Sequence, residues 1–216
     1  MPEDRVLDLI TPPLRFTALQ PNLYRGSYPR PINYRFLKRL RLKYILSLIP
    51  SPITEKTDRP LQDFCREQNI KLLHIECSKD GGKGKKRNVP ITYSIVIQAI
   101  EIIINSDYSP LYIHCLTGSH ITSLIVACLR KISFWSSVSI FNEFINYSAT
   151  INFADRSFVE KFEGDIFVPE DKINWIFWNG FPRETVLDTF SIKLIKSQKE
   201  NGNEKEREND DIKNII

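Results

Sequence analysis

Residues 114–122 read HCLTGSHIT, and this stretch decides the fold. The apolar run 110–113 before it predicts a short strand buried on both faces, and the apolar run 124–129 after it predicts a helix. Cys115 therefore lies where a strand ends, and a loop that contains Gly118 leads into the helix. Backbone N–H groups of such a loop can converge on one concavity, to which the helix N-terminus adds the positive end of its dipole. This arrangement favours a bound anion and a thiolate at Cys115.

From chemistry alone, two interpretations of Cys115 stay open. It is either a reactive nucleophile or an ordinary buried cysteine, because free cysteine is among the most buried residue types. The hydroxyl of Thr122, seven residues later, can donate to a cysteine sulfur when the sulfur is a leaving thiolate. His114 is expected to be a buried structural histidine that bonds loop backbone, not a catalytic base.

The composition predicts one globular domain with tails. The chain has 216 residues, is 42% hydrophobic and carries a net charge of +4, which fits an anionic ligand without demanding nucleic acid. No run approaches the length of a membrane span, and the N-terminus lacks a signal-peptide layout, so we expect a cytoplasmic protein without membrane contact. The cysteines form no C-x-x-C pair, so we expect free thiols and no metal or other cofactor. The predicted segments are an N-terminal segment 1–20, a domain 21–182 and a polar, largely disordered extension 183–216.

Short strands alternate with helices along the predicted domain. This alternation predicts an α/β fold, with a central, mostly parallel sheet flanked by helices. The expected strands are a short run from Leu23 together with Tyr44–Ile49, Lys71–Ile75 and Leu111–His114. The expected helices are Ile32–Leu42, Leu61–Gln68, Ile91–Ile104, Thr122–Ile132 and Trp135–Ile145.

Six stretches in order carry a resemblance to a known family. They read NLYRGSYPRPINYRFLKRLRLKYILSL, IKLLHIECS, PLYIHC, TGSHIT, LRKISFW and FNEF. Over about 23–165 the chain resembles the plant and fungal atypical dual-specificity phosphatases of the protein-tyrosine phosphatase superfamily, and within them a divergent fungal branch of tyrosine phosphatases. The resemblance implies a cysteine-phosphatase fold, a phosphocysteine intermediate and an anionic phosphorylated substrate, because members hydrolyse inositol pyrophosphates or phosphotyrosine.

The resemblance also implies site roles. Cys115 is the nucleophile, Thr122 is the hydroxyl after the loop, and Asp80 is the candidate general acid between the strand ending at Ile75 and the helix at Ile91. The loop N–H groups that would hold phosphate belong to Leu116, Thr117, Gly118, Ser119, His120 and Ile121. A basic segment that would form a lid over the substrate contains Lys83, Lys85, Lys86 and Arg87, and a solvated loop without that role is the alternative.

One position departs from the family pattern. The loop normally ends in an arginine six residues after the cysteine, and this chain has Ile121 there. That arginine grips phosphoryl oxygens with a planar fork, which neither isoleucine nor a nearby lysine reproduces. Losing such a donor costs on the order of 10²- to 10⁵-fold in rate. A protonated His120 would compensate in part. Two functions stay open, a weak phosphatase and a pseudophosphatase that binds anions or acts as a scaffold with active relatives.

Overall fold

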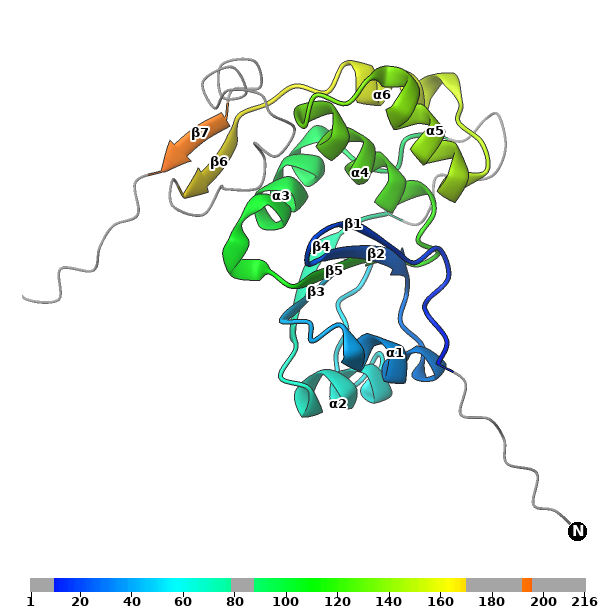
Figure 1. Cartoon of the computed structure of the whole chain (residues 1–216), viewed down its shortest axis with the longest axis vertical. Coiled ribbons are helices and arrows are strands. Elements are labelled where there is room, and N and C mark those ends of the chain that lie inside the picture. The colour runs from blue at the N-terminus through cyan, green and yellow to red at the C-terminus, as the bar shows by residue number, and fades with distance from the viewer. Residues whose placement is uncertain (1–9, 79–87, 170–191, 196–216) are drawn as a thin grey trace, which may run out of the picture.

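The computed structural model describes residues 10–78, 88–169 and 192–195 (Figure 1). The strands are β1 (Thr17–Gln20), β2 (Leu23–Ser27), β3 (Tyr44–Ile49), β4 (Lys71–Glu76), β5 (Leu111–Cys115), β6 (Ile166–Pro169) and β7 (Ile192–Ile195). The helices are α1 (Tyr34–Arg39), α2 (Arg59–Glu67), α3 (Tyr93–Ile104), α4 (His120–Ile132), α5 (Ser137–Ser148) and α6 (Phe153–Glu160). Two 3-10 turns, η1 (Pro31–Asn33) and η3 (Ser106–Tyr108), precede α1 and β5.

β5 lies in the middle of a five-stranded sheet of order β1-β2-β5-β3-β4. It pairs in parallel with β2 and with β3, β4 pairs in parallel with β3, and only the edge strand β1 is antiparallel to its neighbour. The predicted α/β fold with a mostly parallel sheet and a central strand at 111–114 is confirmed. Parallel pairing also brings the carboxyl ends of β2, β3 and β5 to one edge of the sheet.

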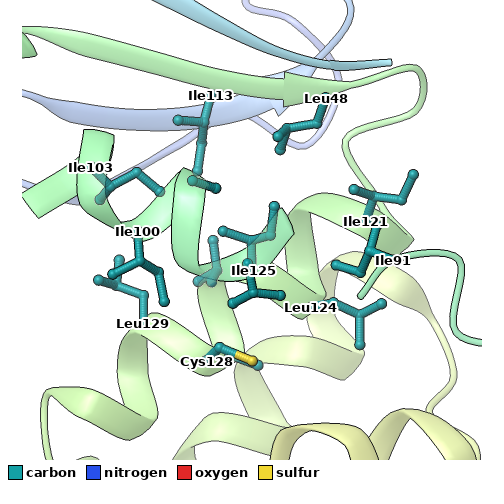
Figure 2. Packing of buried hydrophobic residues seen from close by; sticks show 14 of the residues in the cluster. Leu48, Ile91, Ile100, Ile103, Ile113, Ile121, Leu124, Ile125, Cys128 and Leu129 are labelled. Carbon is teal, nitrogen blue, oxygen red and sulfur yellow. The ribbon is translucent and has the colours of Figure 1, made fainter. Parts of the chain in front are cut away.

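Helices cover both faces of this sheet, α1 and α2 on one side and α3 and α4 on the other (Figure 1). The alternation of side chains along β3 feeds two separate clusters, as the period of two in a strand requires. Ile45 and Ile49 pack with residues of α1 and α2, whereas Leu46 and Leu48 pack with residues of α3 and α4. Figure 2 shows the second cluster, in which Leu48 and Ile113 face Ile100 and Ile125. The strands β3 and β5 are therefore buried on both faces, which explains their nearly continuous apolar sequences.

Capping residues set several helix boundaries. The Asp58 carboxylate accepts a hydrogen bond from the Leu61 N–H at 3.0 Å, so α2 begins before the predicted Leu61. α4 begins at His120, two residues earlier than predicted, and α1 is shorter than the predicted Ile32–Leu42 because a 3-10 turn replaces its start. The strand β1 and the helix α6 were not predicted. The signal for α6 is the reciprocal cap of Asn152 and Asp155, which sequence reading missed.

Two strands fall in the predicted terminal segments. β1 lies within 1–20 and joins the main sheet, and β7 lies within 183–216 and pairs in parallel with β6. The predicted boundary at 182–183 falls outside the described residues. Among the helices that the structure describes, none is long and apolar enough to cross a membrane.

His114 joins the two central strands through a buried polar contact. Its side chain is fully buried, its Nε2 lies 2.9 Å from the Ser47 hydroxyl on β3, and its Nδ1 lies 3.3 Å from the Cys115 carbonyl oxygen. Burial lowers the pKa of His114 to about 4, against the smaller opposing effect of the bond to the Cys115 carbonyl. A neutral imidazole that donates from Nδ1 and accepts at Nε2 satisfies both contacts. Its contact with loop-end backbone is the one that the sequence predicted.

We expect the free energy of unfolding to fall as pH drops through the range in which His114 stays neutral in the folded chain but is protonated in the unfolded chain. That window runs from about 6.5, the ordinary pKa of histidine, down to about 4. The contribution lost at pH 4 is at most about 3 kcal/mol. Urea unfolding at pH 7, 6, 5 and 4 measures it. His114→Gln, which keeps polar atoms but does not titrate, should flatten this part of the slope, and equal slopes in the two proteins would contradict the assignment.

Candidate active site

The predicted phosphate-binding loop connects the end of β5 to the start of α4. Cys115 is the last residue of β5 and is 1% exposed, and Ser27, the last residue of β2, is its partner in the parallel register. Residues 116–119 form the loop, and His120 begins the helix. The strand, loop and helix order predicted from the sequence is therefore present. Within the described ranges, no three His, Cys, Asp or Glu side chains form a cluster that could hold a metal ion.

Gly118 holds the loop against the end of β2. Its φ is +67°, in the left-handed region that favours glycine. A Cβ at this position would lie 2.5 Å from the Gly26 carbonyl group and 2.6 Å from the Ser27 nitrogen. The close approach that requires a glycine is thus made to the backbone of β2. A second reason for glycine adds to the conformational one, since no side chain fits between loop and strand.

Neighbouring groups brace the rest of the loop from outside. The Tyr28 N–H donates to the Leu116 carbonyl at 3.3 Å, and the Arg15 guanidinium donates to the Thr117 carbonyl at 3.1 Å. The Ser119 N–H donates to the Thr117 hydroxyl at 3.3 Å, so one of the predicted phosphate-binding N–H groups has a partner within the loop. Carbonyls that are held from outside fix the peptide planes, and with them the directions of the N–H groups.

The His120 side chain points away from the loop. It is 2% exposed, its Nε2 lies 2.7 Å from the Asp155 carboxylate of α6, and its ring meets Phe144 edge-on. Asp155 is itself fully buried and caps α6. The idea that a protonated His120 compensates for the missing arginine is therefore not supported by this geometry. His120 ties the start of α4 to α6, and only its backbone remains available to the loop.

Ile121 and Thr122 also turn inward. Ile121 is 3% exposed and packs in the cluster beneath the loop, where Figure 2 places it beside Ile91 and on the side of Leu48. Thr122 is fully buried, and its hydroxyl has no hydrogen-bond partner within the described ranges. The predicted bond from this hydroxyl to the Cys115 sulfur is not formed here, and it stays a prediction for the thiolate. Buried hydroxyls without a partner are uncommon in folded proteins.

Arg25 is the residue that sequence reading missed. It lies on β2, is fully buried, and its Nη2 donates to the Gly118 carbonyl at 2.9 Å and to the Ser123 hydroxyl at 2.8 Å. Its guanidinium also stacks on the Tyr147 ring, 4.0 Å from the centroid. Burial lowers the pKa of Arg25 to about 10, which still leaves it charged at neutral pH. The available signal was an arginine at an inward position of the predicted strand, two residues after the buried Leu23.

The predicted acid and lid cannot be placed. Asp80, Lys83, Lys85, Lys86 and Arg87 all lie in 79–87, outside the described residues. Their roles stay predictions. Of the described residues on either side, Ser78 and Pro90 are joined, because the Ser78 hydroxyl donates to the Pro90 carbonyl at 2.7 Å.

A groove of about 310 Å³ lies beside the loop. The exposed apolar side chains of Leu14, Ile32 and Leu116 line it. Two cations, Arg15 and Arg30, lie along the same groove. The surface next to the loop therefore combines apolar contact area with positive charge.

Several known proteins are similar to this chain in sequence or in fold. The family described as the tyrosine phosphatase family matches residues 10–180. The protein named "Putative tyrosine-protein phosphatase OCA6" of Saccharomyces cerevisiae is 48% identical over 182 residues, which cover 79% of this chain and 80% of that protein. Inositol diphosphatase DSP3 of Arabidopsis thaliana is 32% identical over 163 residues, covering 74% and 76%. The crystal structure of the core catalytic domain of the PP-IP phosphatase SIW14 from S. cerevisiae, in complex with citrate, matches with a TM-score of 0.63 at 32% identity, covering 72% of this chain and 89% of that one.

A parallel sheet whose central strand ends in a cysteine, followed by a glycine-containing loop and a helix, defines a cysteine-phosphatase fold. The chain belongs to the tyrosine phosphatase family. Its reaction class is the hydrolysis of phosphoric monoesters. The resemblance drawn from the sequence is confirmed.

We expect Cys115 to be alkylated faster than the other three cysteines near pH 7. Burial raises the pKa of Cys65 and of Cys77 to about 12 and raises that of Cys128 as well, so these remain thiols at neutral pH. Cys115 lies between the end of β5 and the loop that leads into α4, the position at which the sequence predicts a thiolate. Iodoacetamide labelling followed by peptide mapping gives the four rates, with urea-unfolded protein as the control in which they converge. Equal labelling of Cys115 and Cys65 in the folded protein would remove the case for an activated nucleophile.

Proposed function

We propose that this chain is a phosphatase that acts on a phosphate ester or an inositol pyrophosphate through a phosphocysteine at Cys115. The thiolate attacks phosphorus, the S–P bond forms, and the bond from phosphorus to the leaving oxygen breaks with protonation of that oxygen. Water then attacks phosphorus, the S–P bond breaks, and inorganic phosphate leaves with the thiolate restored. The loop N–H groups hold the phosphoryl oxygens in both steps.

The observation that carries this proposal is the position of Cys115. It ends the central strand, beneath a loop that the Gly118 contact presses onto β2 and that leads directly into α4. A helix N-terminus and converging N–H groups stabilise an anion at that point. The buried hydroxyl of Thr122 one turn into α4 is the group that we assign to the sulfur when it leaves.

Other assignments complete the proposal. Asp80 is the candidate donor of the proton to the leaving oxygen. The absent loop arginine makes the reaction slow, because Ile121 offers no donor to the developing charge and His120 is engaged by Asp155. A cytoplasmic location is part of the same proposal.

The substrate class that we favour is a polyphosphorylated inositol. Arg15 and Arg30 add positive charge beside the loop, outside the position of the transferred phosphoryl group. The predicted lid adds Lys83, Lys85, Lys86 and Arg87. Several cations around one phosphate-binding loop suit a ligand with several phosphates better than a single phosphotyrosine. The names of relatives such as Inositol diphosphatase DSP3 point the same way.

The second candidate is a pseudophosphatase that binds anions and associates with active relatives of the family. The observation in its favour is the apolar setting of Ile121, whose side chain belongs to the core cluster. A side chain used for packing makes no contact with a phosphoryl group. In this alternative, the intact loop backbone retains anion binding while turnover is lost.

Restoring the arginine separates the two candidates. We expect Ile121→Arg to raise the turnover of p-nitrophenyl phosphate by about tenfold or more, since a fork-shaped donor again reaches the phosphoryl oxygens. Its midpoint of thermal unfolding should fall, because the substitution removes a buried apolar side chain.

Two controls accompany this measurement. Ile121→Lys carries the same charge without the planar fork and should recover less activity. Adding Cys115→Ser to Ile121→Arg should abolish the gain. Unchanged turnover in a folded Ile121→Arg protein would favour the pseudophosphatase.

The lid assignment has its own test. We expect inositol hexakisphosphate to bind more tightly than a phosphotyrosine peptide, and the difference to shrink as salt rises, because the contacts are between exposed charges. Calorimetric titration of wild type and of the variant Lys83→Ala, Lys85→Ala, Lys86→Ala measures it. Lys38→Ala, Lys43→Ala, Lys56→Ala removes the same charge from 38–56, in another part of the chain, and serves as the control. Equal affinity of wild type and the lid variant would show that the basic segment is a solvated loop.

A further inference from the structure

Arg25 is a buried charge without a carboxylate partner. Among the residues that the structure describes, no acid forms an ion pair with it, and its Nε and Nη1 have no hydrogen-bond partner. Buried charges are normally paired, because an unpaired ion in the interior is costly. Its guanidinium therefore has unused charge and unused donors directly beneath the loop.

A second buried arginine shows the usual solution. Arg130 on α4 is 4% exposed and forms a bidentate ion pair with Glu143. Its Nε donates to Oε2 at 2.8 Å and its Nη2 donates to Oε1 at 3.0 Å. Glu143 is also the acid with the strongest attraction for Arg25. Both of its oxygens bond Arg130, and within the described residues Glu143 forms no ion pair with Arg25.

The contacts of Arg25 point at the loop. Its Nη2 donates to the Gly118 carbonyl at 2.9 Å. Negative charge on Cys115 favours the charged form of Arg25. No described side chain around Arg25 pairs with it as an anion. The phosphate-binding loop can supply that negative charge, first as the Cys115 thiolate and then as bound phosphate.

We propose that Arg25 is a positioning residue whose positive charge, beneath the phosphate-binding loop, stabilises the Cys115 thiolate and the bound phosphate. It thereby takes over the charge of the loop arginine that is replaced by Ile121. This inference rests on the proposed function, because it needs a thiolate and a phosphate at Cys115. Arg25 does not touch the substrate. It acts through the Gly118 carbonyl and through its unpaired charge, so it supplies electrostatic stabilisation but not the bidentate grip of the absent arginine.

Three groups near this pair, His114, Cys77 and Tyr112, keep one charge state in the range of the test. Burial lowers the pKa of His114 to about 4, raises that of Cys77 to about 12 and raises that of Tyr112. The remaining charged or titratable groups that face Arg25 are Glu143 and Tyr147 of α5 and Arg130 of α4. These groups, and His120, which follows the loop and bonds Asp155, are the same in wild type and in the Arg25 variants, so the difference between their profiles from about pH 5 to 9 reports Arg25.

The experiment measures the rate of Cys115 alkylation against pH, with inorganic phosphate as the protecting anion. In Arg25→Gln, we expect the half-maximal pH to rise by about one unit and the phosphate concentration that halves the rate to rise about tenfold. Arg25→Lys keeps the charge and should stay near wild type in its pH profile. Arg66→Gln removes an α2 arginine that pairs with Glu55 and Asp63, on the opposite face of the sheet, and is the matched control, expected to leave the profile in place.

The outcomes distinguish an electrostatic role of Arg25 from a purely structural one. If Arg25→Gln is folded and its profile matches wild type, the inference is overturned. If Arg25→Gln does not fold, Arg25→Lys decides, because a profile displaced by about one unit despite the retained charge would equally overturn it. Failure of the proposed function is distinct, since wild-type Cys115 would then react no faster than Cys65.

Discussion

The contact between the loop at Gly118 and the end of β2 is the constraint on which the site depends. Loop and strand meet backbone to backbone, with no room for a Cβ between them. This contact places the Gly118 carbonyl within reach of Arg25 and presses the loop onto the edge of the sheet where β2 and β5 end together. The loop geometry is therefore set by the sheet, because the register of β2 on β5 determines which residues meet the loop.

Side chains of the loop and of the first turn of α4 divide between two tasks. Three side chains point into the protein. His120 bonds Asp155, Ile121 packs in the apolar cluster, and the buried Thr122 hydroxyl has no hydrogen-bond partner among the described residues. Leu116 and Thr117 are exposed toward the groove. The loop thus offers a ligand mainly its backbone, and positive charge must come from outside it. Arg25 below, Arg15 and Arg30 beside the loop are the described cations in position to supply that charge.

Much of the fold followed from local patterns. Short strand-like runs predicted the four parallel strands of the main sheet. The pattern is strongest in β3 and β5, because strands buried on both faces have few polar residues. Helical spacing located five helices, with errors of a few residues where caps decide the ends. β1 was not predicted because an edge strand of four residues has no strong sequence pattern. α6 was not predicted because its first turn is recognised by a cap and not by apolar spacing.

The sequence by itself determined the class of protein, the cysteine and its loop, and the absence of the arginine at position 121. These are statements about residue type and order, which the chain carries locally. Only the tertiary structure decided where the side chains of His120, Ile121 and Arg25 point. Orientation depends on partners that are distant in sequence, such as Asp155 for His120 and Gly118 for Arg25. Pairing across the sheet and between helices brings those partners together, and no local pattern encodes it.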